Sequence, residues 1–290
     1  MNIKIKTFEV DRNFSDTRLD KFLKIKVSKF PQSLIEKNLR KKKILVNKKK
    51  SKSSYKLNLG DKVEIFFDAK IEQSKPRKKI IKNDEFIKIR KNIIFDCKDY
   101  LILNKPYGYA SQDGLKVKKN IIDILNQGGN KYYIVHRLDM ETTGVMLFAK
   151  NREYAKKFSD QFQSRNIKKK YYVIVKGSIS KNKGEIITKE KIKKKEVTSK
   201  SYFEVKNKNQ EYSFLEVEIL TGRKHQIRKQ FSELGHPVIG DTRYGDKNSK
   251  NQLCLFSYHM EFEYLNKIKK YSLKLPKFME DFVQRSFYNF

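Results

Sequence analysis

The apolar residues of this chain come in short runs, and this feature limits the folds open to it. Runs such as Val145–Ala149 and Tyr171–Val175 stop at about five residues, whereas a helix that spans a bilayer needs roughly 20. Short apolar runs of this kind are typical of strands in the core of a sheet. We therefore expect a soluble globular protein with no membrane span.

Near the N-terminus, two helical patterns precede a small sheet. Apolar residues recur at helical spacing from Thr17, and Pro31 can open a second helix that ends in the basic run 40–43. Ile44–Val46 is then predicted as the first strand of the sheet. These elements make a compact unit that we assign to residues 14–68.

The rest of the chain has a different organisation. Residues 69–85 show no hydrophobic period and carry a proline among charges, so we predict a linker. Beyond it, strand patterns such as Ile93–Asp96 and Phe214–Leu220 are mixed with helical patterns such as Arg152–Ser164. Because the two do not alternate regularly, the α+β class is expected for the second domain, residues 86–290.

The net charge is strongly positive. The chain has 67 Lys and Arg against 33 Asp and Glu, a formal charge of +34, which favours a polyanionic partner such as nucleic acid. Only 12 of these cations are Arg, and the many Lys, Ile and Asn are also what an AT-rich genome produces. The scarce Arg residues are therefore more informative, because their planar fork suits phosphate and carboxylate.

Several kinds of site are excluded by the residue types available. The four His and two Cys have no metal-ligand spacing, and no Gly-rich loop is followed by Lys and Ser or Thr. Two Cys cannot form a disulfide framework, and the first residues lack the apolar stretch of a signal peptide. We expect no metal, no nucleotide or flavin cofactor, and a location in the reducing cytoplasm.

One carboxylate has an unusual setting. In residues 134–147, IVHRLDMETTGVML, the charged residues around Asp139 interrupt two apolar strands at a loop closed by Gly144. A loop held by a rigid sheet can present a carboxylate to a substrate. The alternative is that Asp139 caps a turn and is neutralised by Arg137.

Three further segments favour the chemical role. Residues 221–228 place Arg223 and Arg228 at a strand-to-helix junction, where they can hold phosphate or pair with a buried carboxylate. Residues 168–173 put aromatic side chains beside a basic run, a combination that stacks bases and follows a nucleic-acid backbone. The loop Asn104–Gly108 is the third.

Together these segments resemble the pseudouridine synthases that modify large ribosomal RNA, the family of the RluA, RluC and RluD enzymes. The resemblance runs from about residue 93 to residue 258. Its signature, His-Arg-Leu-Asp, a short gap and Thr-Ser-Gly, is matched by residues 136–144, with Thr143 where the family usually has Ser. The Lys-x-Tyr strand and the Gly-Arg-x-His-Gln-Ile-Arg segment of the family are matched by residues 169–171 and 222–228.

The N-terminal unit is similar to the RNA-binding module of the ribosomal protein S-four superfamily. Arg18 opens its first helix and Arg40 ends its second, and the resemblance implies that both contact RNA. They could instead be solvated helix residues. An S-four-like module followed by the catalytic domain is the order of the RluC and RluD types, whereas RluA lacks the module.

The resemblance implies an isomerase that converts uridine to pseudouridine in RNA, most directly in large-subunit ribosomal RNA, without a cofactor. The implied fold is a mixed, mainly antiparallel sheet with flanking helices. Asp139 would attack C1′ of the ribose, or stabilise or deprotonate the sugar, and Arg228 would keep it ionised. Tyr171 would stack on uracil, near C5, as the base or as its gatekeeper.

RNA contacts are assigned to Arg137, Arg223 and Lys105, around a uridine flipped out of its helix. Two other functions stay open: a tRNA-directed synthase of the same family, and a noncatalytic RNA-binding or ribosome-assembly protein. The second would not need Asp139 together with a distant Tyr and Arg. We expect a monomer, and we interpret His136 as a structural hydrogen-bonding residue.

Overall fold

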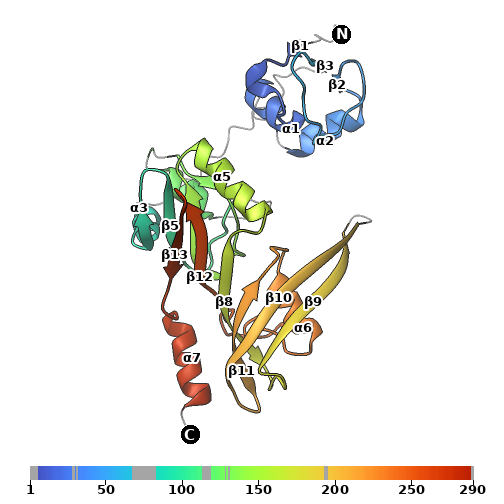
Figure 1. The fold of residues 1–290 in the computed structure, drawn as a ribbon. Coiled ribbons are helices and arrows are strands. Elements are labelled where there is room, and N and C mark those ends of the chain that lie inside the picture. Colours follow the sequence, from blue (N-terminus) through green and yellow to red (C-terminus); the bar gives the residue numbers. More distant parts are fainter. Residues whose placement is uncertain are drawn as a thin grey trace. The chain divides into compact units, whose positions relative to one another are not determined.

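The computed structural model describes residues 6–27, 30, 32–66, 83–112, 119–127, 129, 131–192 and 195–288. Contacts between Cα atoms divide the chain into two units, residues 1–80 and 81–290, which we describe separately (Figure 1). Positions 69–82 of the predicted linker lie outside the described residues. Its last three positions belong to helix α3, which begins at Asn83, so the linker prediction was too long at that end.

The N-terminal unit consists of short helices on a three-stranded antiparallel sheet of order β1-β3-β2. Strand β1 pairs with β3, so the unit begins before the predicted residue 14. Its core comes from the apolar faces of the helices and strands, including Leu19, Phe22, Ile35 and Val63. The elements are β1 (Lys6–Glu9), η1 (Arg12–Phe14), α1 (Leu19–Phe22), η2 (Leu23–Val27), α2 (Gln32–Arg40), β2 (Ile44–Val46) and β3 (Lys62–Ile65).

The second unit is built on a ten-stranded sheet with the path β4-β5-β7-β12-β8-β11-β10-β9, in which β6 also pairs with β7 and β13 with β12. Strands β7 and β12 are parallel, and the other pairs are antiparallel. The strands are β4 (Ile93–Asp96), β5 (Tyr100–Lys105), β6 (Tyr133–Ile134), β7 (Thr143–Ala149), β8 (Lys168–Lys176), β9 (Lys183–Ile192), β10 (Lys195–Lys208), β11 (Tyr212–Ile219), β12 (Leu255–Tyr264) and β13 (Lys267–Ser272). The predicted α+β class and mixed, mainly antiparallel sheet are confirmed.

Helices cover both faces of this sheet, because its central strands are apolar on both sides. Leu101 and Leu103 of β5 belong to one core, with α4 and α6, whereas Tyr100 and Ile102 belong to another, with α5. The helices are α3 (Asn83–Arg90), α4 (Ile121–Asn126), α5 (Arg152–Gln163), α6 (Gln226–Glu233) and α7 (Lys277–Phe287). Among the described residues, no helix is long and apolar enough to cross a membrane.

Three central strands bring together the segments singled out in the sequence. Ser257 of β12 is the register partner of Gly144 of β7 on one side and of Tyr171 of β8 on the other. Gly144 has a φ of +113°, and a Cβ atom there would lie 2.1 Å from the Ser257 carbonyl oxygen. Glycine is therefore required where the loop that carries Asp139 enters the sheet.

Candidate active site

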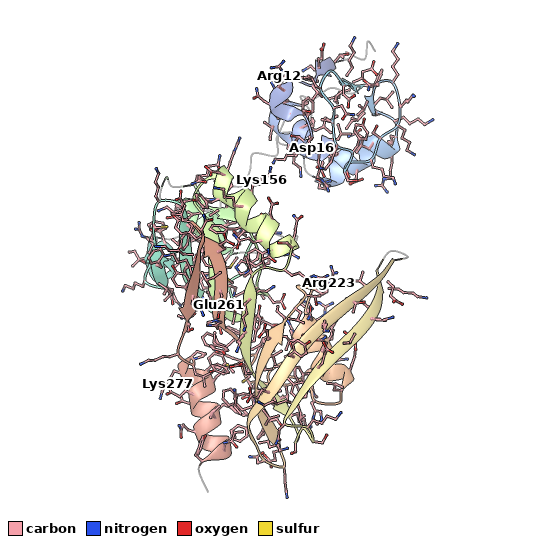
Figure 2. The ribbon with its side chains drawn as sticks, in the orientation of Figure 1. Arg12, Asp16, Lys156, Arg223, Glu261 and Lys277 are labelled. Atoms are coloured by element: carbon pink, nitrogen blue, oxygen red, sulfur yellow. The ribbon has the colours of Figure 1, made fainter. Side chains whose placement is uncertain are left out.

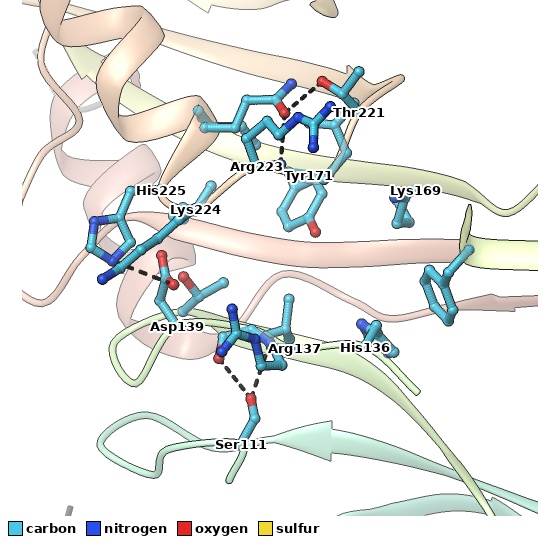
Figure 3. Close-up of a pocket in the computed structure, with 18 of the residues that line it drawn as sticks. Ser111, His136, Arg137, Asp139, Lys169, Tyr171, Thr221, Arg223, Lys224 and His225 are labelled. Atoms are coloured by element: carbon cyan, nitrogen blue, oxygen red, sulfur yellow. Dashed lines mark hydrogen bonds and ion pairs between the residues drawn. The ribbon is translucent and has the colours of Figure 1, made fainter. Parts of the chain in front are cut away.

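A cavity of about 830 Å³ opens where these strands and their loops meet (Figure 3). Its walls come from the loop before β7, the start of β8 and the junction between β11 and α6. Asp139, Tyr171 and Arg223 line it, so the structure brings together three of the predicted segments.

The loop that carries Asp139 is fixed by hydrogen bonds to its backbone. The Ser111 hydroxyl donates to the Leu138 carbonyl at 2.6 Å and accepts from the Leu138 amide at 3.0 Å. The Thr142 amide donates to the Asp139 carbonyl at 3.1 Å, which closes the turn. The Asp139 side chain is thereby left 30% exposed on the cavity wall.

Lys105 is a second support of this loop, and its assignment to RNA binding was wrong. Its side chain is completely buried, and Nζ donates to the carbonyls of Pro106 (3.1 Å), Met140 (3.1 Å) and Thr142 (2.7 Å). Burial lowers the pKa of Lys105 to about 7, while three carbonyl acceptors favour the ammonium, which has three N–H donors. A buried ammonium used in this way cannot reach a phosphate.

Arg228 is held mainly by a residue that the sequence analysis missed. Its Nε and Nη2 donate to the two carboxylate oxygens of Asp241, each at 2.7 Å, and both side chains are buried. Burial alone would raise the pKa of Asp241, but the bonds from Arg228 and nearby backbone amides hold it below its ordinary value. Gly240, with a φ of +79° and no room for a Cβ, sets this turn. The Gly240-Asp241 pair, which follows a helical pattern in the sequence, is the signal that could have indicated Asp241.

The remaining guanidinium nitrogen of Arg228 faces the cavity loop. Nη1 lies 3.2 Å from Glu141 Oε2 and 3.8 Å from Asp139 Oδ2. The predicted proximity of Arg228 to Asp139 is therefore present, but the two-bond fork belongs to Asp241. Arg228 thus places positive charge beside Asp139. On the other side, His225 Nε2 lies 3.6 Å from Oδ1, and burial lowers the pKa of this imidazole.

Tyr171 and His136 are uncharged at neutral pH. Burial raises the pKa of the Tyr171 phenol, and the negative charge of Asp139 adds to the effect. Burial lowers the pKa of His136 to about 3, and its Nε2 accepts from the Leu147 amide at 2.9 Å, as expected of a structural residue. His225 Nδ1 shares a hydrogen bond of 2.9 Å with the Tyr244 hydroxyl, and its Nε2 faces Asp139.

The exposed cations form a second feature of the cavity. Arg137 and Arg223 line its wall with exposed side chains, together with Arg165 and Lys224, which the sequence analysis did not single out. None of the four makes a side-chain ion pair with a carboxylate in the described part of the chain. Arg223 projects from the unit and does not pack into its core (Figure 2).

In the N-terminal unit, the two predicted RNA contacts differ. Arg18 forks onto Asp20, with distances of 2.7 and 3.1 Å. Arg40 is exposed at the end of α2 and makes one long bond, 3.4 Å, to the Glu36 carbonyl. Arg40 is thus the freer cation of the two. The described residues of the whole chain contain no cluster of three or more His, Cys, Asp and Glu arranged for a metal ion.

Known proteins are similar to this chain in sequence. The family model for RNA pseudouridylate synthase matches residues 99–233, which include Asp139, Tyr171 and Arg228. Ribosomal large subunit pseudouridine synthase C of Rickettsia felis is 34% identical over 252 residues, 80% of this chain and 82% of the relative. The protein of the same name from Buchnera aphidicola is 35% identical over 256 residues, 82% of this chain and 80% of the relative.

A solved structure agrees at the level of the fold. Human RNA Pseudouridylate Synthase Domain Containing 4 superposes with a TM-score of 0.60 at 22% identity, over 70% of this chain and 95% of that one. The chain therefore belongs to the RNA pseudouridylate synthase family. It is an RNA pseudouridine synthase, as its sequence predicted.

Proposed function

We propose that this enzyme converts uridine to pseudouridine in large-subunit ribosomal RNA, with Asp139 as its catalytic carboxylate. The observation that carries the proposal is the state of that carboxylate. Its oxygens lie 3.6 Å from His225 and 3.8 Å from Arg228, too far for hydrogen bonds, while the charge of Arg228 is close enough to stabilise the carboxylate. Both oxygens are thus available to a substrate in the cavity.

The anchoring of Arg228 explains why the carboxylate stays available. A free guanidinium would close on Asp139 with two short bonds and make it a poor nucleophile or base. Because Asp241 occupies the fork, Arg228 supplies positive charge to Asp139 through one nitrogen only. The arrangement places a positive charge beside Asp139 without covering its oxygens.

The reaction needs no net oxidation or reduction. The bond from N1 of uracil to C1′ of the ribose breaks, a bond from C5 to C1′ forms, C5 loses its proton, and N1 gains a proton. Asp139 can attack C1′ and later leave, or can take a proton from the sugar as the glycosidic bond breaks. Both routes need an ionised, exposed carboxylate. The raised pKa of Tyr171 favours a stacking surface for uracil over a base in the free enzyme.

The exposed cations would hold the RNA around the site. A uridine in a helix must be flipped out to reach the cavity, at a cost of roughly a few kcal/mol. Arg137, Arg223 and Lys224 can offset this cost through phosphate contacts. We assign further RNA contacts to the N-terminal unit, an S-four-like module by its sequence, with Arg40 as its freer cation. We also propose that the enzyme is a monomer that acts in the cytoplasm, as expected from the sequence.

The substrate assignment rests on the names of the relatives and is tested directly. Purified protein is incubated with transcripts of large-subunit ribosomal RNA and, separately, of tRNA, both labelled with tritium at C5 of uridine. Tritium release from the ribosomal transcript, with pseudouridines mapped to defined positions, is expected. Release from tRNA alone would support the tRNA-directed alternative, and binding without release from either would support the noncatalytic one.

A further inference from the structure

Three consecutive lysines open β8, and they differ in their partners. Lys168 pairs with Glu218 at 3.5 Å, and Lys170 pairs with Glu216 at 2.7 Å. Side chains alternate between the faces of a strand, so Lys169 points the other way, where it lines the cavity. It makes no hydrogen bond or ion pair with any residue that the structure describes. The cation that faces the cavity is therefore the unpaired one.

The surroundings of the Lys169 ammonium are poor in acceptors. Nζ lies 5.6 Å from the centre of the Phe162 ring, and a Cβ at Gly222 would lie 3.9 Å from it. Burial lowers the pKa of Lys169 to about 8. A half-buried cation without a counter-charge is unfavourable in the free protein. An anion from outside the chain would remove that penalty.

A second cation, Arg165, lies in the connection between α5 and β8, just before the strand that carries Lys169. Arg165 is exposed, lines the cavity and makes no side-chain bond to a described residue. Its φ is +63°, a left-handed conformation that is strained for a residue with a side chain. Two unpaired cations suit an anion such as phosphate better than a neutral uracil carbonyl.

We propose that Lys169 and Arg165 hold a backbone phosphate of the RNA next to the uridine that enters the cavity. This subsite rests on the proposed function, because it needs an RNA strand in the cavity. By fixing a neighbouring phosphate, it would set the position of the target ribose relative to Asp139.

The test uses the full chain and a short single-stranded RNA of about nine nucleotides with one central uridine. In a series of such RNAs, a single phosphate is replaced by an uncharged methylphosphonate, one linkage at a time. Affinity is measured by fluorescence anisotropy for wild type, Lys169→Met and Lys169→Arg. Lys176→Met is the matched control, because Lys176 is an exposed lysine of the same strand outside the cavity.

Lys169→Met is expected to bind the unmodified RNA about tenfold more weakly, with a salt slope smaller by about 0.7. Lys169→Arg restores binding, and Lys176→Met binds like wild type. At one linkage next to the uridine, methylphosphonate weakens wild type about tenfold but leaves Lys169→Met unchanged. The proposal is wrong if, at every linkage, the affinity lost through methylphosphonate simply adds to the affinity lost through Lys169→Met. It is also wrong if Lys169→Arg does not restore binding.

These outcomes are separate from those that test the proposed function. Affinity does not depend on turnover, so coupling between Lys169 and one phosphate can be measured even if no tritium is released. Absence of tritium release from every RNA would refute the synthase activity. Normal release without coupling would refute only the phosphate subsite.

Discussion

Asp241→Asn is the change that tests how Arg228 is positioned. In the wild type, Arg228 Nε donates to Oδ2 of Asp241, and Nη2 donates to Oδ1, which also accepts the amides of Arg243 and Tyr244. Asparagine can keep an oxygen at the Oδ1 position and thus three of these bonds. It loses the charge, and its NH₂ group faces the Nε–H of Arg228, which has nothing to donate to.

The magnitude follows from the burial of the pair. The side chains of Arg228 and Asp241 are 3% and 0% exposed, and removing one partner of a buried ion pair costs about 3–5 kcal/mol. Arg228 keeps Glu141 at 3.2 Å and Asp139 at 3.8 Å, so its charge is not left uncompensated. We therefore expect a loss near the lower limit, about 3 kcal/mol, which lowers the melting temperature by about 6–12 °C.

The same change should reduce turnover. Arg228, held by one bond to residue 241 in place of two, can turn towards Asp139, so the single-turnover rate at saturating RNA should fall about 100-fold. RNA affinity should stay close to wild type, because Asp241 does not line the cavity. The control is Asp246→Asn, an exposed carboxylate in the same segment. A melting temperature and a single-turnover rate that both equal those of the wild type would refute this explanation of how Arg228 is positioned.

Three further changes test other parts of the site. Gly144→Ala should destabilise the fold far more than Gly235→Ala in urea unfolding, because both have positive φ but only the first clashes with Ser257. Lys105→Met should lower the free energy of unfolding by about 1–3 kcal/mol and slow turnover. A smaller slope of log RNA affinity against log salt concentration in this variant would show that Lys105 contacts phosphate. As pH falls from 6.5 towards 3, the unfolded chain gains a proton at His136 that the folded chain does not, so the free energy of unfolding should fall. If the free energy of unfolding of His136→Gln falls as steeply with pH as that of the wild type, this explanation is wrong.

Local patterns were sufficient to predict much of the central sheet and the loop of Asp139. Ile93–Asp96, which is mostly exposed, and Val145–Ala149, which is buried, are both strands whose apolar runs can be read without tertiary information. Strands β9 and β10 escaped prediction because they carry many Lys and Glu, and their pairing with each other compensates for a weak apolar pattern. The parallel pairing of β7 with β12 joins distant segments and leaves no local signal.

The chemistry of the site was predictable to a similar extent. Asp139 and Arg228 stand in motifs, so the sequence could place both near the reaction. The sequence could not show that Asp241 takes the fork of Arg228, since this depends on the tight turn at Gly240. Lys105 was misassigned because a lysine beside a proline is usually exposed, and only the fold shows three carbonyls converging on its ammonium.

The role of Asp139 is tested most directly by Asp139→Asn on the RNA in which the wild type has mapped pseudouridines. The substitution removes the charge and the nucleophile but scarcely changes the volume. The account predicts no tritium release from C5-labelled uridine under single-turnover conditions, with RNA affinity within a few-fold of wild type. Substantial release by this variant would contradict the assignment of Asp139 as the catalytic carboxylate.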